Sequence, residues 1–392
     1  MVKKTGPSKK TASSKPSSSS KQSTKKPTPE ASSQALQSKE QQQRLLNIFS
    51  STFNNVLTSD GFSRLLQDIK QALFNREFAI AFGREDYLEA YAARWSPTRA
   101  LCYASVFLSI KNHLDGILIP NKEAKDGKLH LTEAGLLSDP QAADTAQETQ
   151  SAGGEAIQDL KTDSTSSTQR NSFLQMLSVG GCAAEHIAFA SYLQTTATSG
   201  HLTLLDSGPW EAVISHLESS TINPPPISKY ASAARQATNH PMLEKGQLAL
   251  NVVQRDILDL DMASLSAQCS HGKVPIVLTL LFTLNELYTT AGIGKTTKFL
   301  KNIGQVLAAE SLVLVVDSPG SYSEAALGKE KKKYPMQWLL DHTLLETDTP
   351  GHSWEKLLSD DSTWFRLLEG LSYPIPLENM RYQMHLYRLQ KS

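Results

Sequence analysis

The 392-residue chain contains only three cysteines, Cys102, Cys182 and Cys269, and they stand far apart. No CxxC pair and no zinc-ligand spacing is present, so the sequence predicts no metal site and no disulfide. This cysteine usage is typical of a reducing, intracellular compartment.

Long apolar runs are also missing. The longest, residues 274–284, is shorter than the ~20 residues that span a bilayer. The first 30 residues contain no apolar signal segment. We therefore expect neither a secreted nor a membrane protein.

The signatures of several hydrolases are absent. The chain has no HExxH and no GxSxG motif, which leaves metal-dependent and serine hydrolysis without support. Gly294, Lys295 and Thr296 imitate a P-loop, but the first glycine of that motif would fall at Thr289. An ATPase is not indicated.

Composition divides the chain into four parts. Residues 1–33, rich in Lys, Ser, Thr and Pro, predict a disordered basic tail that serves as an import signal, an RNA contact or simply a solvated segment. Residues 34–120 show the three-and-four apolar spacing of a helical region, broken at Pro97. Residues 121–170 are polar and predict a low-complexity surface insertion, and residues 171–392 form the main domain.

Charge separates the tail from the body. Residues 1–30 carry a net charge of +7 and, because the chain is neutral overall, the remainder carries −7. A mildly acidic body gains little from long-range attraction to phosphate, so nucleic-acid binding would need a local basic patch or the tail. The basic run at residues 329–333 fits either a solvated face or an RNA phosphate contact.

The main domain alternates short apolar runs with helical stretches. This alternation predicts an α/β fold with a doubly wound parallel sheet, whose strands are solidly apolar because helices cover both faces. A last segment, residues 380–386, alternates apolar with polar residues and predicts an antiparallel strand at or near an edge. The predicted parallel strands are residues 173–179, 201–205, 248–254, 276–281 and 311–316.

The turn after the first strand is built from small residues. Ser178, Gly180 and Gly181 lead into a helix that carries Glu185 in its first turn. A turn of this kind lets a ligand lie against backbone at a helix N-terminus. The alternative is a tight turn that binds nothing, since the regular GxGxxG pattern is missing.

Acidic residues follow the next two strands. Asp206 stands about 20 residues beyond the turn, where a carboxylate can accept hydrogen bonds from both ribose hydroxyls. Asp256 and Ile257 follow the third strand and suit an adenine amino group and ring. Either aspartate could be a surface residue, but their order at strand ends favours one nucleoside site.

Polar residues also follow the fourth and fifth strands. Asn285 and Glu286 follow the fourth strand and are candidates for gripping a substrate that must be oriented and lose a proton. They could instead cap the following helix. Asp317 either shapes the same cleft, together with Ser318 and Tyr322, or forms an Asx-type turn.

Several motifs together resemble the fungal 25S ribosomal RNA uridine-N3 methyltransferases, from about residue 87 onward. They are residues 94–103 around RWSP, SVGG at 178–181 with Glu185, LFTLNELY at 281–288, VDSPGSYS at 316–323, YPMQWLLDH at 334–342 and LENMRY at 377–382.

The resemblance implies a seven-stranded Rossmann-like domain that transfers a methyl group from S-adenosylmethionine to N3 of a uridine in large-subunit rRNA. It implies ribosomal RNA or a pre-ribosomal particle as partner, in the nucleus or nucleolus and also in the cytoplasm. Together with the positions of the residues at the strand ends, the resemblance predicts cofactor binding by Ser178, Gly180, Gly181, Glu185, Asp206, Asp256 and Ile257, catalysis by Asn285, Glu286 and Asp317, and substrate binding by Tyr288, Ser318 and Tyr322.

Two features keep alternatives open. Cys182 and Ala184 stand where methyltransferases usually have glycine, so a non-catalytic methyltransferase-like assembly factor is one alternative. A methyltransferase acting on a protein or small molecule is another. Because N3 of a paired uridine is hidden, an RNA target must be unpaired or extruded, with Tyr288, Tyr322 and Trp338 as candidates to stack on it or as core residues.

Overall fold

The computed structural model describes residues 36–120, 172–320, 322–327, 330–346 and 350–392, with only the backbone described for residues 322–327 and 330–333. The predicted tail, residues 1–33, and insertion, residues 121–170, lie outside the described residues. Ala35–Ser392 form one compact unit.

The predicted N-terminal helical region is present. Ser38 begins its first helix with a capping box, in which Gln41 N donates to Ser38 Oγ (3.2 Å) and Ser38 N donates to Gln41 Oε1 (2.8 Å). Pro97 lies in the first turn of a new helix, where its missing N–H costs nothing, so it separates two helices as predicted. The helices are α1 (Lys39–Thr52), α2 (Asn54–Leu57), α3 (Phe62–Phe74), α4 (Phe78–Ala81), α5 (Glu85–Arg94), α6 (Ser96–Ser109) and α7 (Lys111–Asp115).

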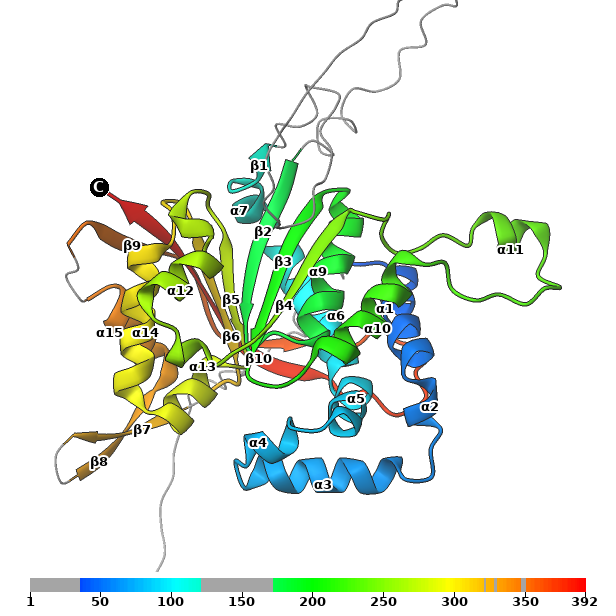
Figure 1. Ribbon diagram of the computed structural model, residues 1–392, viewed down its shortest axis with the longest axis horizontal. Helices are drawn as coiled ribbons and strands as arrows, with labels where there is room; N and C mark the ends of the chain where they lie inside the picture. The colour runs from blue at the N-terminus through cyan, green and yellow to red at the C-terminus, as the bar shows by residue number, and fades with distance from the viewer. Residues whose placement is uncertain (1–35, 121–171, 321, 328–329, 347–349) are drawn as a thin grey trace, which may run out of the picture. The chain divides into compact units, whose positions relative to one another are not determined.

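The main domain is built on one sheet with the strand order β4-β3-β2-β5-β6-β10-β9 (Figure 1). Its five parallel strands match the predicted ones: β2 (Ser172–Val179), β3 (Ser199–Asp206), β4 (Leu248–Gln254), β5 (Val277–Leu281) and β6 (Leu312–Asp317). The short β1 (Ile119–Pro120) pairs with β2 outside this order.

The last strand lies next to the edge of the sheet. β10 (Met380–Lys391) pairs antiparallel with β6 on one side and with β9 (His352–Phe365) on the other, so the prediction of a late antiparallel strand near an edge is confirmed. The sequence analysis did not predict β9, nor the hairpin of β7 (Tyr322–Leu327) and β8 (Glu330–Pro335).

Helices cover both faces of the sheet, as a doubly wound fold requires (Figure 1). One core cluster joins the N-terminal helices to α9 (Ala183–Thr196) and α10 (Glu211–Ile222), and helix α6 packs along α9. The other cluster joins the opposite face to α12 (Met262–Gln268), α14 (Ile293–Val306) and α15 (Met336–Leu344). Among the described residues, no helix combines the length and apolar character needed to cross a membrane.

Candidate functional site

A cavity of about 460 Å³ lies at the carboxyl ends of four neighbouring strands, β4, β3, β2 and β5. The chain runs from β2 outward to β3 and β4 and then returns to the other side of β2, so β2 and β5 flank the point where the strand order reverses. Ligands of open α/β sheets bind at such a point. The cavity lining includes Gly180, Cys182, Glu185, Asp206, Asp256, Ile257, Phe282, Thr283 and Glu286 from the main domain and Leu73, Phe78, Phe82, Tyr91 and Arg99 from the helical region.

The turn after β2 has no room for side chains. Gly180 has a φ of +68°, and a Cβ there would lie 2.5 Å from Thr283 Oγ1. A Cβ on Gly181 would lie 2.6 Å from the Ser178 side chain. Both glycines are therefore required by close approach, and Gly180 also by its left-handed backbone.

A glutamate in the first turn of α9 caps the N-terminus of the helix. Glu185 Oε2 accepts a hydrogen bond from Cys182 N at 2.8 Å, which satisfies a backbone donor that the helix leaves free. Burial raises the pKa of the Glu185 carboxyl, while this hydrogen bond and Arg99 oppose the rise. Glu185 thus shapes the end of the helix that faces the cavity.

Asp206 is held at the end of β3 with one oxygen to spare. Its Oδ1 accepts hydrogen bonds from Gly208 N (2.6 Å) and Trp210 Nε1 (3.2 Å), and burial raises the pKa of the carboxyl. Among the described residues Oδ2 accepts no hydrogen bond, so this oxygen remains for a ligand. At the end of β4, the exposed Asp256 caps a short 3-10 turn, η2 (Ile257–Asp259), and Ile257 is buried.

The end of β5 presents a strained residue to the cavity. Phe282 has a φ of +58°, which is costly for a residue with a bulky side chain, and its N–H donates to Val316 O at 2.6 Å. Two turns of helix follow, α13 (Leu284–Glu286) and η4 (Leu287–Ala291). Glu286 lines the cavity, and burial raises the pKa of its carboxyl against the opposing effect of Arg76 and Arg99.

Aromatic rings from both parts of the chain form one wall of the cavity. Phe82 meets Tyr91 edge-on, with 5.1 Å between ring centroids, and lies 6.2 Å from Trp210. Arg99 lies over the Tyr91 ring at 5.5 Å and over the Phe282 ring at 5.4 Å. The helical region therefore completes the cavity rather than standing apart from it.

Comparison with protein families decides the class of protein. A family of SAM-dependent methyltransferases, Methyltransf_34, matches residues 49–388. The chain belongs to this methyltransferase family. Its cofactor is therefore S-adenosylmethionine, and the methyltransferase fold predicted from the strand pattern is confirmed.

The methyltransferase is also similar to a curated relative. It is 27% identical to the 25S rRNA (uridine(2843)-N(3))-methyltransferase of Saccharomyces cerevisiae over 356 residues, which cover 88% of this chain and 85% of the yeast protein. This similarity confirms the resemblance to the fungal uridine-N3 methyltransferases that the motifs indicated.

Solved methyltransferase structures are similar to this chain at low identity. A SAM-dependent methyltransferase from Methanosarcina mazei covers 59% of this chain and 100% of its own, with 9% identity and a TM-score of 0.33. The 16S rRNA (adenine(1408)-N(1))-methyltransferase from Catenulisporales acidiphilia covers 61% and 97%, with 11% identity and a TM-score of 0.30. Scores this low add nothing on substrate.

The residues of the cavity fit the cofactor of the methyltransferase. Gly180 lines the cavity at the start of the turn into α9, where a ligand can lie against backbone, and the oxygen of Asp206 that accepts no hydrogen bond suits ribose hydroxyls. Cys182 and Ala184 also line the cavity, so two small side chains stand there without filling it.

Six of the predicted site residues do not line the cavity. Ser178 is buried and accepts a hydrogen bond from Thr279 at 2.8 Å, and Gly181 packs against Ser178. Tyr288 is 1% exposed and belongs to the core cluster that includes residues of α14 and α15, so its ring lies in the core and, contrary to the prediction, is not a substrate contact. The others are Asn285, Asp317 and Ser318.

Asp317 ties two loops together instead of facing the cavity. Its Oδ2 accepts from Asn285 N (3.0 Å) and its Oδ1 from Ser318 N (2.7 Å). Burial raises the pKa of the carboxyl to about 6, against these two hydrogen bonds. These bonds do not form the predicted Asx-type turn, which needs an N–H two residues on, where Pro319 has none. Asp317 instead positions the segment that carries Glu286.

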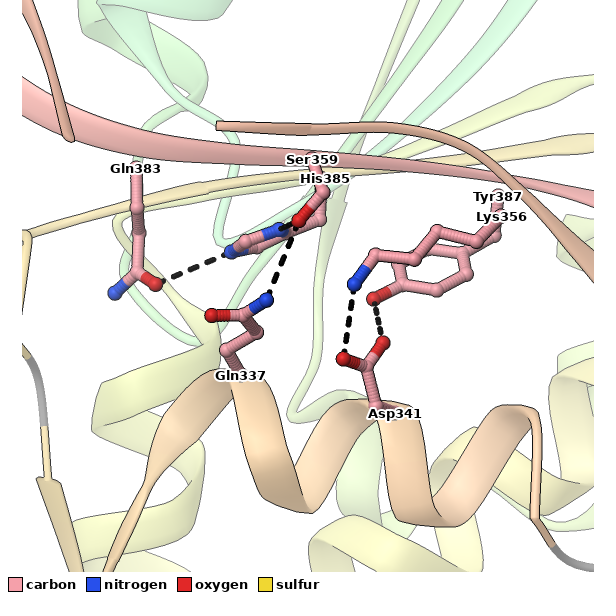
Figure 2. A network of polar contacts seen from close by, with 7 residues as sticks. All are labelled: Gln337, Asp341, Lys356, Ser359, Gln383, His385 and Tyr387. Atoms are coloured by element: carbon pink, nitrogen blue, oxygen red, sulfur yellow. Dashed lines mark hydrogen bonds and ion pairs between the residues drawn. The ribbon is translucent and has the colours of Figure 1, made fainter. Parts of the chain in front are cut away.

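A chain of polar contacts runs from Gln383 through His385 and Ser359 to Gln337 on α15 (Figure 2). Gln383 donates to Ser318 O at 2.6 Å and accepts from His385 Nε2 at 3.1 Å, and Ser359 Oγ lies 2.9 Å from His385 Nδ1. Burial lowers the pKa of His385 to about 4, so the ring is neutral, with its proton on Nε2 and Nδ1 accepting from Ser359.

The remaining predicted contacts are less defined. The side chain of Tyr322 lies outside the described residues. Trp338 is 44% exposed on α15, where it stacks between Tyr334 and His342, and it does not line the cavity.

Sequence reasoning missed Arg99, Phe282 and the aromatic wall as cavity residues. Arg99 belongs to the RWSP segment and Phe282 to LFTLNELY, so both were quoted as family motifs without a role. Nothing in the spacing of the helical region indicates that it faces the ends of strands more than 70 residues away.

Proposed function

We propose that this methyltransferase transfers the methyl group of S-adenosylmethionine to N3 of a uridine in large-subunit ribosomal RNA. The observation that carries the proposal is the alignment with the yeast uridine-N3 enzyme, which extends through 88% of this chain rather than over the cofactor half alone. A pre-ribosomal particle would be its partner, in the nucleus, the nucleolus or the cytoplasm.

The cavity has the properties that this reaction needs. Bound S-adenosylmethionine supplies an electrophilic methyl group on a sulfonium sulfur. Gly180, Glu185, Asp206, Asp256 and Ile257 would form the cofactor side, the first by close approach and the aspartates by hydrogen bonds.

The substrate side would lie between the helical region and β5. A uridine must leave its base pair before N3 is accessible, and an extruded base is stabilised by stacking on aromatic rings. Phe82 and Phe282 line the cavity and are the rings proposed for this role. They replace Tyr288, whose ring is in the core.

Glu286 is the group proposed to accept the imide proton. It lines the cavity, and burial raises the pKa of its carboxyl, which makes it a stronger base than an exposed glutamate. Asp317 and Asn285 would act through position, because the hydrogen bond between them fixes the start of the turn that carries Glu286.

The test is mass spectrometry of nucleosides from large-subunit rRNA. Cells lacking the gene should lose 3-methyluridine at one position, and the full-length protein should restore it. Asp206→Ala should restore it at least about tenfold less efficiently, because a charged hydrogen-bond acceptor for the cofactor is lost.

Asp261→Ala is the matched control. Asp261 also accepts a backbone hydrogen bond, from Ser264 N at 2.7 Å, but it does not line the cavity. It should restore the modification like the wild type. An unchanged level of 3-methyluridine in the deleted strain would contradict the proposal.

A further inference from the structure

Two arginines line the cavity, the exposed Arg255 and the half-buried Arg99, and Arg99 is the one held among aromatic rings. Among the described residues its side chain forms no ion pair within 4.0 Å and one hydrogen bond, to the hydroxyl of Tyr91. A guanidinium offers five N–H donors, so most of them are unused.

The surroundings of Arg99 keep it charged and oriented. The rings of Tyr91 and Phe282 lie at 5.5 Å and 5.4 Å from the guanidinium carbon. Burial lowers the pKa of Arg99, but Tyr91, Tyr103 and other neighbours raise it further, with a net rise above the usual value. A fixed cation without a carboxylate partner is costly in a half-buried place unless an anion joins it.

Three carboxylates lie near enough to interact with this charge, and none of them forms an ion pair with Arg99 within 4.0 Å. Glu185 accepts from Cys182 N, and Asp317 accepts from Asn285 N and Ser318 N. Glu286 lines the cavity without an ion pair to Arg99. None of the three therefore accounts for the free donors of the guanidinium.

The position of Arg99 along the cavity identifies the anion. Asp206 and Asp256 follow β3 and β4, on one side of β2, and Arg99 meets Cys182, Glu185 and Phe282 at the ends of β2 and β5, on the other side. A donor with its nucleoside at Asp206 and Asp256 extends its amino acid toward Arg99. The carboxylate of that amino acid is negative at neutral pH, whereas a uracil imide is neutral until it loses its proton.

We propose that Arg99 binds the α-carboxylate of S-adenosylmethionine and thereby selects the intact amino-acid end of the cofactor. This rests on the cofactor site proposed above, but it is independent of the RNA substrate. The helical N-terminal region then contributes directly to cofactor recognition, because Arg99 lies on α6. Hydrogen bonds between a guanidinium and a carboxylate are stronger than those between neutral groups.

The test is calorimetric binding of two donors that differ only in this carboxylate, S-adenosylmethionine and decarboxylated S-adenosylmethionine. The wild type should prefer the carboxylated donor. Arg99→Gln should bind it roughly 30-fold or more weakly and bind the decarboxylated donor with nearly unchanged affinity, so that the preference disappears. Arg99→Lys should retain part of it.

Arg94→Gln is the matched control. Arg94 lies one turn earlier in the same region, pairs with Glu378 at 2.6 Å and does not line the cavity, so this variant should keep the wild-type preference. Thermal unfolding of each variant verifies that it is folded.

Two results would overturn the proposal. Unchanged affinity of Arg99→Gln for S-adenosylmethionine would mean that the carboxylate lies elsewhere. An equal loss for both donors in a folded variant would mean that Arg99 supports the cavity wall and does not read the carboxylate. Neither result bears on 3-methyluridine formation, so failure here and failure of the proposed function are distinguishable.

Discussion

Single residues at the ends of strands carry most of what the sequence could predict about the site. Gly180, Asp206, Asp256 and Ile257 line one cavity as expected, because a parallel sheet brings the carboxyl ends of its strands to the same edge. The spacing along the chain is enough to predict this meeting. It does not predict which way a side chain turns once a helix begins.

The residues after β5 and β6 illustrate that limit. Asn285 and Glu286 are adjacent, yet only Glu286 lines the cavity, while Asn285 uses its backbone N–H to bind Asp317. Tyr288 follows two residues later and lies in the core. Successive side chains on a helix point about 100° apart, so of two neighbouring residues one can face the cavity and the other the core.

His186 provides a test at the scale of one residue. It lies on α9 with no exposed surface, and among the described residues neither ring nitrogen has a hydrogen-bond partner. Burial lowers its pKa from 6.5 to about 4, so the folded protein binds this proton less readily than the unfolded chain. The stability that depends on neutral His186 is present above pH 6.5 and is lost as the pH falls toward 4.

The expected change is large enough to measure by denaturant unfolding. Because the unfolded chain binds the proton of His186 more tightly, the free energy of unfolding of the wild type should be about 2 kcal/mol lower at pH 5 than at pH 7.5. His186→Leu should not lose this stability. Its free energy of unfolding, compared with that of the wild type, should therefore rise by about 2 kcal/mol between pH 7.5 and pH 5. His240→Leu, at an exposed position, should show the same dependence of unfolding free energy on pH as the wild type. If His186→Leu also shows the wild-type dependence, His186 is not the group responsible.

Among the elements, the parallel strands were predictable and the last part of the sheet was not. β5 and β6 are buried at every residue, which helices on both faces impose. β9 is different: most of its 14 residues are half-buried or exposed, and charges interrupt its pattern, because it forms the edge of the sheet. A strand with little to bury gives little signal in the sequence.

The contacts of β10 with the loop after β6 provide a test at this scale. Gln383 is 4% exposed, and its Oε1 accepts from His385 Nε2 (Figure 2). Its Nε2 donates to Ser318 O. Gln383→Leu removes the acceptor of His385 Nε2, and His385 has no exposed surface, so the substitution should lower the free energy of unfolding by roughly 1–3 kcal/mol.

The control lies on the same strand. Gln390 donates to Glu355 at an exposed position, so Gln390→Leu should change the free energy of unfolding by less than about 0.5 kcal/mol. Denaturant titration of both variants decides the matter. Equal stability of Gln383→Leu and the wild type would show that this chain of contacts does not hold the loop.

At the scale of the whole molecule, the helical region and the sheet domain share one core and one cavity. Ala35–Ser392 form a single compact unit, and α6 packs along α9 (Figure 1). Composition separates residues 34–120 from residues 171–392, but it cannot reveal that Phe82, Tyr91 and Arg99 close a cavity built by the other part. Contacts of this kind depend on how helices dock, which no local pattern encodes.

The measurement that tests the central claim most directly is a crystal structure of the full chain with S-adenosylhomocysteine. The account predicts ribose hydroxyls at Asp206 Oδ2, adenine against Ile257 and the carboxylate at Arg99, all within the cavity beside Gly180. Binding at any other surface, or a complex in which the cavity remains free of the ligand, would contradict it.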